Sequence, residues 1–257
     1  MANVLYLVHR LPYPPNKGDK LRSYHLLRYL VARHRVFLGT FVDDPDDEVH
    51  VDTLRSLCAG LHVARLNPGS AKLASLAGLL RGEPLTLHYY DDAGLRRWVA
   101  QTLATQAIDA AVVFSSSMAQ YAEGHSGLPM LVDFVDVDSA KWAGYAGSHR
   151  WPMSWLYRRE GTLLLAYERA VTARAHRAFF VTEQETSLFA SLAPECASTI
   201  ESMGNGVDAQ FFAPDAARES PFSAGELPLV FTGAMDYWPN VDAVRWFTTD
   251  VLPALRK

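Results

Sequence analysis

Short apolar runs alternate with stretches of helical periodicity along the first two hundred residues. Between the runs, apolar residues recur every three or four positions, as at Leu95, Val99 and Leu103, which predicts amphipathic helices. Strands that are apolar on both faces and alternate with helices predict an α/β fold, a doubly wound, Rossmann-like parallel sheet. The predicted strands are residues 4–8, 36–42, 61–66, 110–114, 130–134, 178–181 and 198–201.

A second strand–turn–helix pattern begins after a loop that is rich in Pro, Ala, Ser and Gly. Residues 230–240 read VFTGAMDYWPN: an apolar strand over residues 229–231 ends at Gly233, and Asn240 can cap the helix that follows. We therefore predict an N-terminal domain over 1–213, a linker over 214–226 and the start of a second domain over 227–257. Because one strand–helix unit cannot bury both faces of a sheet, we expect the chain to be part of a longer protein.

Composition narrows the class of protein further. The 257 residues carry 24 basic and 28 acidic side chains, a net charge of −4, which gives no global attraction to nucleic acid. Cys58 and Cys196 have neither metal-ligand spacing nor a disulfide pattern, so we expect reduced thiols in a cytoplasmic protein. No run of about 18 apolar residues predicts a membrane span.

The loop after the first strand is the first candidate site. Residues 9–22 read HRLPYPPNKGDKLR and join the carboxyl end of a strand to the start of a helix, where open α/β sheets bind ligands. Gly18 would let a phosphate approach the backbone, and Lys17, Lys20 and Arg22 add positive charge. The loop lacks the Gly-x-Gly-x-x-Gly pattern of dinucleotide sites. The alternative is a proline-stiffened surface loop with solvated basic residues.

Two further polar positions follow predicted strands. His9 ends the first strand at the expected ligand edge, and Ser115 follows the strand over residues 110–114 at that same edge. Ser115 lacks the Gly-x-Ser-x-Gly setting of a hydrolase nucleophile. Helix capping is the favoured interpretation for Ser115, and a hydroxyl contact to a ligand is the second.

Three acids end and follow the strand over residues 130–134. On an extended chain, Asp133, Asp136 and Asp138 would point the same way, and such like charges repel unless a cation, a donor or a sugar hydroxyl lies between them. The alternative is that Asp138 or Ser139 only caps the next helix. No histidine or fourth carboxylate is spaced to complete a metal site, so we expect none.

Residues 151–159, WPMSWLYRR, mix aromatic side chains with arginines. This composition suits a membrane interface or a lipid-linked substrate. Packing of the two tryptophans in the core is the favoured alternative.

These motifs together resemble the family-4 glycosyltransferases of the GT-B fold. Residues 205–214, NGVDAQFFAP, resemble the family's interdomain signature, and residues 231–243, FTGAMDYWPNVDA, resemble the start of its donor domain. Within the family, residues 133–142, DFVDVDSAKW, resemble the sugar transferases associated with exosortase (PEP-CTERM) exopolysaccharide loci. The family's Glu-x7-Glu donor motif does not occur at the matching place, because the chain ends at Lys257.

The resemblance implies roles for particular residues. Gly18 and Arg22, with Thr232 and Gly233, would contact the donor diphosphate, and Asp136 or Asp138 would lie near the transferred sugar as the catalytic carboxylates. On the acceptor side the candidates are His9, Lys17, Lys20 and Ser115. One departure is that residues 235–237, MDY, stand where many members have a basic residue on the diphosphate.

The resemblance also implies a function. The complete protein would be a glycosyltransferase of the hexosyltransferase type that moves a sugar from a nucleotide-sugar to a polysaccharide or lipid-linked acceptor in exopolysaccharide biosynthesis. It implies retention of the anomeric configuration, no metal and no cofactor, in the cytoplasm with peripheral contact to the inner membrane face. We expect the present chain alone to be inactive. The alternatives are a nucleotide-sugar epimerase of GT-B fold and a non-catalytic acceptor-binding fragment.

Overall fold

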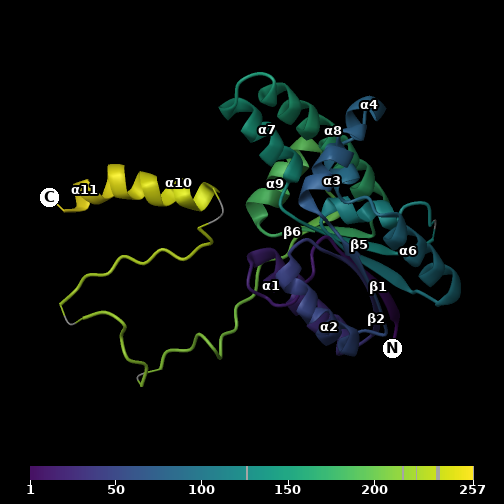
Figure 1. Ribbon diagram of the computed structural model, residues 1–257, viewed down its shortest axis with the longest axis horizontal. Helices are drawn as coiled ribbons and strands as arrows, with labels where there is room; N and C mark the ends of the chain where they lie inside the picture. Colours follow the sequence, from purple (N-terminus) through teal and green to yellow (C-terminus); the bar gives the residue numbers. More distant parts are fainter. Residues whose placement is uncertain (126, 216, 224, 236–237, 257) are drawn as a thin grey trace. The chain divides into compact units, whose positions relative to one another are not determined.

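Seven strands form one sheet in the computed structural model, and every neighbouring pair is parallel (Figure 1). Their order across the sheet is β3-β2-β1-β4-β5-β6-β7. All seven predicted strands are confirmed, with ends that differ by one or two residues. Their bounds are β1 (Asn3–Val8), β2 (Arg35–Val42), β3 (Gly60–Arg65), β4 (Ala110–Phe114), β5 (Met130–Val135), β6 (Arg177–Phe180) and β7 (Ile200–Ser202).

The structure describes residues 1–125, 127–215, 217–223, 225–235 and 238–256. They divide into two units, Met1–Gly206 and Val207–Lys257, and each is described by itself. The first unit contains the whole sheet. The predicted assignment of 1–213 to an acceptor-side domain, 214–226 to a linker and 227–257 to a donor domain stays a prediction.

Helices of the first unit cover both faces of the sheet, as the doubly wound prediction requires. On one face, Leu27 and Leu54 pack with inward residues of the strands such as Tyr6. On the other face, Leu95, Val171 and Phe189 pack against the alternate strand residues. The helices are α1 (Gly18–Val31), α2 (Val51–Leu57), α3 (Pro68–Ser75), α4 (Ala77–Arg81), α5 (Leu85–Tyr89), α6 (Ala93–Thr105), α7 (Asp138–Ser148), α8 (Met153–Arg174) and α9 (Glu183–Leu192), with short 3-10 turns η1 (Pro45–His50), η2 (Ser116–Tyr121) and η3 (Pro194–Cys196).

The strand order reverses between β1 and β4. From β1 the chain moves through β2 to β3 at one edge, and then returns to place β4 on the other side of β1. The connections that leave β1 and β4 therefore run in opposite directions across the sheet, outside the carboxyl ends of these strands. This position is the one that open α/β sheets use for ligands.

The second unit differs from its prediction. Leu229, Val230 and Phe231 are exposed and form no strand, because the described part of this unit holds no other strand with which their backbone groups could pair. The predicted helix is present as α10 (Trp238–Trp246), followed by the π-helical turn η4 (Phe247–Val251) and α11 (Leu252–Leu255).

Asn240 is not the cap that the sequence predicts. Helix α10 already begins at Trp238, and the Asn240 amide donates instead to the carbonyl oxygen of Ala234, at 2.9 Å. This bond closes the chain around Gly233, where a Cβ atom would lie 2.8 Å from the Asn240 amide nitrogen. Asp236 and Tyr237, the last two residues of the departure from the family pattern, lie outside the described residues.

The favoured core position of the two tryptophans is also wrong. Trp151 and Trp155 are 80% and 53% exposed, because they lie at the outer end of the α7–α8 hairpin, beyond the reach of the sheet. The space between α7 and α8 is filled instead by Trp142, Tyr145 and Tyr157, whose rings contact one another.

Candidate functional site

His9 lies at the strand-order reversal. It follows Val8, which pairs with Phe114 at the end of β4. The His9 ring stacks on the Phe114 ring, with centroids 5.8 Å apart and 2° between planes, and meets the edge of Tyr90. Its Nε2 atom lies 3.5 Å from Oδ2 of Asp19. Its Nδ1 atom is buried and has no hydrogen-bond partner among the described residues.

Arg10 fixes the other side of Asp19. It donates from Nη1 to Asp19 (2.9 Å) and from Nη2 to Asp43 (2.8 Å), which joins the loops after β1 and β2. Burial alone would raise the pKa of Asp19, but the His9 hydrogen bond and the Arg10 charge outweigh it and hold the pKa well below the ordinary value. Asp19 is therefore ionised and faces two cationic or donor groups.

The start of α1 is open beside this cluster. Helix α1 begins at Gly18, and no side chain caps its first turn. Lys17 and Gly18 are exposed, and a Cβ atom at Gly18 would meet nothing within 4 Å. The backbone N–H groups and partial positive charge of a helix start can therefore face an anion here.

Lys20 does not have the free ammonium group that the acceptor-side prediction requires. Its side chain is 2% exposed, and its Nζ atom lies 2.5 Å from Asp47 in η1. Position 20 falls on the face of α1 that is covered by η1, two residues after the open Gly18. Lys20 thus joins two elements of the fold.

The guanidinium of Arg22 is also already hydrogen-bonded to other side chains. It donates from Nε to Asp133 Oδ2 (2.7 Å), from Nη2 to Asp133 Oδ1 (3.1 Å) and from Nη1 to Asn205 (2.9 Å). Burial raises the pKa of Asp133, although the Arg22 guanidinium opposes the shift. Asn205, the first residue of the NGVD motif, is therefore linked to α1 and β5 by the buried guanidinium of Arg22.

The three aspartates do not point the same way. A spacing of three residues already places Asp133 and Asp136 on opposite faces of an extended chain. Val135, whose φ of +71° is uncommon for a β-branched residue, also bends the chain between them. Asp133 faces Arg22, whereas Asp136 and Asp138 face Lys141, whose Nζ lies 2.7 Å and 3.2 Å from their carboxylate oxygens. The ammonium group of Lys141 therefore offsets the repulsion between the Asp136 and Asp138 carboxylates.

The predicted caps after β5 are wrong in detail. Helix α7 begins at Asp138 after Val137, with no side-chain cap, so Asp138 only adds an acid to its first turn. Ser139 donates from its N–H and its hydroxyl to Glu168 of α8, at 3.2 Å and 2.5 Å. A buried carboxylate on another helix thus takes the place of a local cap.

Ser115 does not cap the turn that follows it. Its φ is +77°, and its hydroxyl lies 3.2 Å from the hydroxyl of Ser117. The neighbouring Ser116 is 1% exposed, and its buried hydroxyl has no hydrogen-bond partner among the described residues. Ser115 and Val135, the non-glycine residues with positive φ in the described chain, thus lie where the adjacent strands β4 and β5 end.

Thr232 and Gly233 belong to the second unit, where both are exposed around a bend. Their contact to a donor diphosphate stays a prediction. No group of three His, Cys, Asp or Glu side chains in the described chain is placed to hold a metal ion. The expectation of a metal-independent reaction is not tested by this observation.

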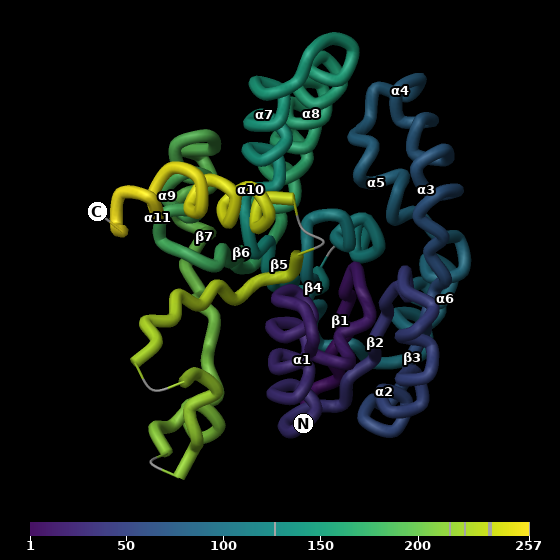
Figure 2. The backbone as a smooth tube through the Cα atoms, turned by 60° about the vertical axis from the view of Figure 1, so that its left-hand side comes forward, coloured from purple at the N-terminus to yellow at the C-terminus, as the bar shows by residue number. Residues whose placement is uncertain are grey.

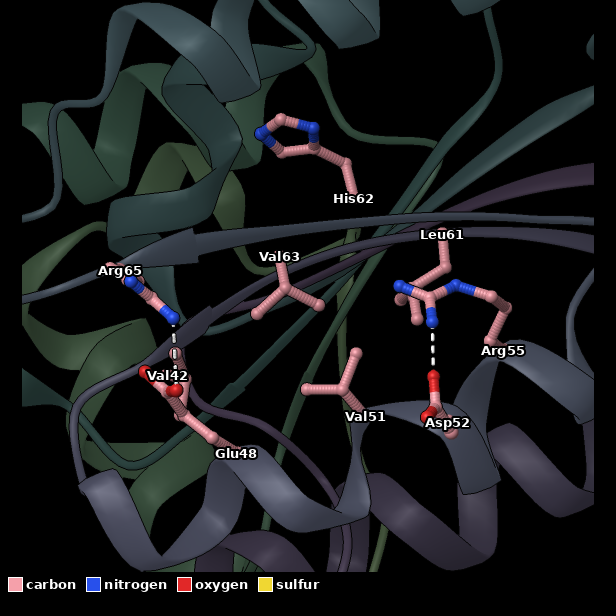
Figure 3. Close-up of a pocket in the computed structure, with 9 residues that line it drawn as sticks. All are labelled: Val42, Glu48, Val51, Asp52, Arg55, Leu61, His62, Val63 and Arg65. Atoms are coloured by element: carbon pink, nitrogen blue, oxygen red, sulfur yellow. Dashed lines mark hydrogen bonds and ion pairs between the residues drawn. The ribbon is translucent and has the colours of Figure 1, made fainter.

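A separate cavity of about 470 Å³ lies against β3 and α2 (Figure 3). Arg65 pairs with Glu48 on one side of it and Arg55 pairs with Asp52 on the other, while Val51 and Val63 lie between the two pairs. His62 points away from these residues. The charged side chains here have partners, and none of their polar atoms is buried without one, whereas the buried Nδ1 atom of His9 has no hydrogen-bond partner among the described residues. The cavity is therefore a weaker candidate than the strand-order reversal at His9.

Sequence reasoning missed several residues of the site. Arg10 and Asp19 stand in the quoted loop, and Asp43 directly follows a predicted strand, so their position at the carboxyl edge was available as a signal. Tyr90 had no such signal, because it ends the short helix α5 far from any predicted strand.

Comparisons with known proteins add little to this geometry. No family model matches the chain, and no curated protein is similar to it. Among solved structures, 24 chains are similar. One of them is Glycyrrhiza uralensis UGT73P12 complexed with glycyrrhetinic acid 3-O-monoglucuronide, with 13% identity and a TM-score of 0.42. The similarity covers 84% of the present chain and 51% of that chain, and it is too distant to carry an argument about function.

Proposed function

We propose that the complete protein is a glycosyltransferase that moves a sugar from a nucleotide-sugar to a polysaccharide or lipid-linked acceptor. The proposal combines the motif resemblance to family-4 glycosyltransferases, including their exopolysaccharide branch, with the site at the strand-order reversal. The observation that carries it is His9, whose ring is held on Phe114 beside an ionised Asp19 while its buried Nδ1 has no partner.

An unpaired buried nitrogen is costly, so a ligand group that completes its hydrogen bonding is the simplest explanation. When Nε2–H is directed to Asp19, Nδ1 is left as the acceptor atom of the ring, which suits a sugar hydroxyl as donor. We assign this hydroxyl to the acceptor substrate, in agreement with the acceptor-side role proposed for His9. The unpaired Ser116 hydroxyl at the neighbouring strand end offers a second polar contact.

The donor diphosphate is proposed to lie at the start of α1. Gly18 allows close approach there, and Lys17 supplies an exposed positive charge. Thr232 and Gly233 complete this part of the proposal through the resemblance alone. Arg22 is reassigned from phosphate binding to positioning, because it is occupied by Asp133 and Asn205.

Asp136 and Asp138 stay the proposed carboxylates near the transferred sugar. A developing oxocarbenium ion is stabilised by nearby negative charge, and each carboxylate is about one-third exposed at the carboxyl edge. Lys141 would balance their charge before substrate binds. Retention of configuration and independence of metal remain parts of the proposal.

The test is transfer from labelled nucleotide-sugars into a membrane extract by the complete protein. We expect label in an acceptor product. His9→Asn should lower kcat/KM for the acceptor by about tenfold to a hundredfold, because it removes the proposed hydrogen bond to the acceptor hydroxyl. His25→Asn, an exposed position on α1, is the matched control and should keep the wild-type rate. Conversion of the nucleotide-sugar without any acceptor would show an epimerase instead, and an unchanged rate for His9→Asn would remove His9 from the site.

A further inference from the structure

We propose that the first unit binds an anionic membrane surface through exposed apolar side chains of α3, α4 and the α7–α8 hairpin. We call this set the Trp–Leu surface. Its members are Leu73, Leu76, Leu80, Trp151, Met153 and Trp155. The inference does not depend on the proposed sugar transfer, because it concerns a different surface and is tested without any sugar.

Leucines of the α3–α4 segment form one exposed group. Leu73 lies on α3, Leu80 on α4 and Leu76 between the two helices, so the three exposed leucines fall within eight residues of the chain. Leu80 is 94% exposed and Leu73 is 72% exposed. In a protein of this size, large apolar side chains left this open in one short segment indicate a contact surface.

The hairpin brings its aromatic residues to the same place. Arg159 of α8 donates from Nη2 to the carbonyl oxygen of Gly78 in α4 (2.8 Å) and from Nη1 to that of Glu83 (3.2 Å). Trp155 lies one turn before Arg159 and so faces the same side of α8, towards α4. In both views, α4 and the outer end of the α7–α8 hairpin lie at the same end of the first unit (Figures 1 and 2).

A second contact fixes the α7–α8 hairpin relative to the helices that carry the leucines. Glu160 of α8 is 2% exposed and accepts from the backbone N–H groups of Leu85 and Thr86 at the start of α5, at 2.7 Å and 2.9 Å. Helix α5 directly follows α4 in the chain. The hairpin and the α3–α4 segment are therefore one structural piece.

Exposed basic side chains lie around the Trp–Leu surface and indicate which kind of partner it binds. Lys72, Arg81, Arg150 and Arg158 are exposed next to its members, although the whole chain carries a net charge of −4. Tryptophan with arginine and lysine is the composition of membrane–water interfaces, where the rings enter the headgroup layer and the cations meet anionic lipid. The surface therefore fits an anionic bilayer.

The surface also stands on the side of the sheet where the candidate site opens. Helix α3 follows the carboxyl end of β3, and α7 follows that of β5, so both begin at the carboxyl edge that carries His9. A membrane bound here would meet this edge of the sheet.

The test is flotation of the full 257-residue chain with vesicles of phosphatidylcholine, either alone or with about 30% phosphatidylglycerol. We expect binding to the anionic vesicles that falls at least about tenfold in the triple variant Leu80→Ser/Trp151→Ser/Trp155→Ser. Arg150→Glu/Arg158→Glu should weaken binding to anionic vesicles by at least about fivefold per residue. All five side chains are exposed, so circular dichroism should show unchanged folding.

A matched control removes apolar side chains elsewhere. Val49→Ser/Leu188→Ser alters exposed residues of η1 and α9 and should leave vesicle binding unchanged. Brominated lipids should quench tryptophan fluorescence of the wild type, and this quenching should be lost in Trp151→Phe/Trp155→Phe. Equal binding by the triple variant would overturn the proposal. A wild-type dimer that the triple variant converts to a monomer, without vesicle binding, would assign the surface to a second copy instead.

Discussion

Asp133 and Arg22 form a buried ion pair. Their side chains are 2% and 8% exposed, and the guanidinium meets both carboxylate oxygens. A buried charge that loses its partner costs far more than the pair itself contributes, since the remaining group stays desolvated. The site therefore depends on both members being present.

Arg22→Leu should lower the free energy of unfolding by about 3–5 kcal/mol, because it leaves Asp133 buried and unpaired. The double variant Arg22→Leu/Asp133→Leu should recover most of this loss, since no isolated charge remains. Chemical denaturation of both variants is the measurement, and Arg28→Leu, an exposed position on the same helix, is the control. Equal losses in the single and double variants would contradict the argument.

Glu168 is a second buried acid, and it makes stability depend on pH. Burial raises its pKa from the ordinary 4.5 to about 8, although the Ser139 hydrogen bonds oppose the shift. Between these values the folded state binds a proton that the unfolded state has lost, so stability falls as the pH rises.

Glu168→Gln should remove this dependence, because its amide does not titrate. The difference in unfolding free energy between variant and wild type should shift in favour of the variant as the pH rises from about 4.5 to 8, by up to about 1.4 kcal/mol per pH unit. Denaturation at a series of pH values measures it. A difference that is flat with pH would show that Glu168 is ionised throughout.

Helices α7 and α8 are in close contact at Gly161. A Cβ atom there would lie 2.9 Å from the carbonyl oxygen of Ser139 and 3.1 Å from the nitrogen of Ala143, so backbone atoms rather than flexible side chains would have to move. The α7–α8 hairpin therefore owes its close packing to a residue without a side chain.

Gly161→Ala should cost about 1–3 kcal/mol of stability, even though alanine favours helices, because the added methyl overlaps α7. Gly144→Ala is the matched control on α7, where a Cβ atom meets nothing within 4 Å. It should be neutral or stabilise by about 0.5–1 kcal/mol. Thermal unfolding of both variants measures these changes in stability. A Gly161→Ala variant that is more stable than the wild type would contradict the described packing.

The elements were predictable where one pattern sufficed. Most of the strands are short apolar runs, so they could be located from the sequence. The edge strand β7 carries a weaker signal, because only Ile200 of its three residues is buried. Residues 229–231 show the limit of that signal, because a strand also requires a neighbour with which to pair. The α5 helix shows another limit, since a buried Glu160 from α8 meets its first N–H groups and no local pattern indicates this.

The candidate site was predictable only in its position. The loops after β1 and β5 were expected at the carboxyl edge, and the parallel sheet places them there. The partners were not predictable: Lys20 meets Asp47, and Arg22 meets Asp133 over more than a hundred residues of sequence. The left-handed conformation of Val135 has no signal in the sequence, because β-branched residues rarely adopt it. The separation of Asp133 from Asp136 did have one, because residues three apart on an extended chain point to opposite faces.

At the scale of the molecule, the polar groups without partners and the uncapped start of α1 lie at one edge of the sheet. The unpaired His9 nitrogen, the unpaired Ser116 hydroxyl and the open start of α1 all lie where β1 and β4 end. None of the described helices is long and apolar enough to cross a membrane. We propose that this edge binds the two substrates of a sugar transfer.

The most direct test is kcat/KM for the nucleotide-sugar donor, measured on the complete protein and on Gly18→Val. Open space surrounds a Cβ atom at Gly18, so the variant should fold as the wild type does while its side chain occupies the proposed diphosphate position. We expect a loss of about a hundredfold or more in kcat/KM, with an unchanged circular dichroism spectrum. A Gly18→Val protein with wild-type kcat/KM would contradict it.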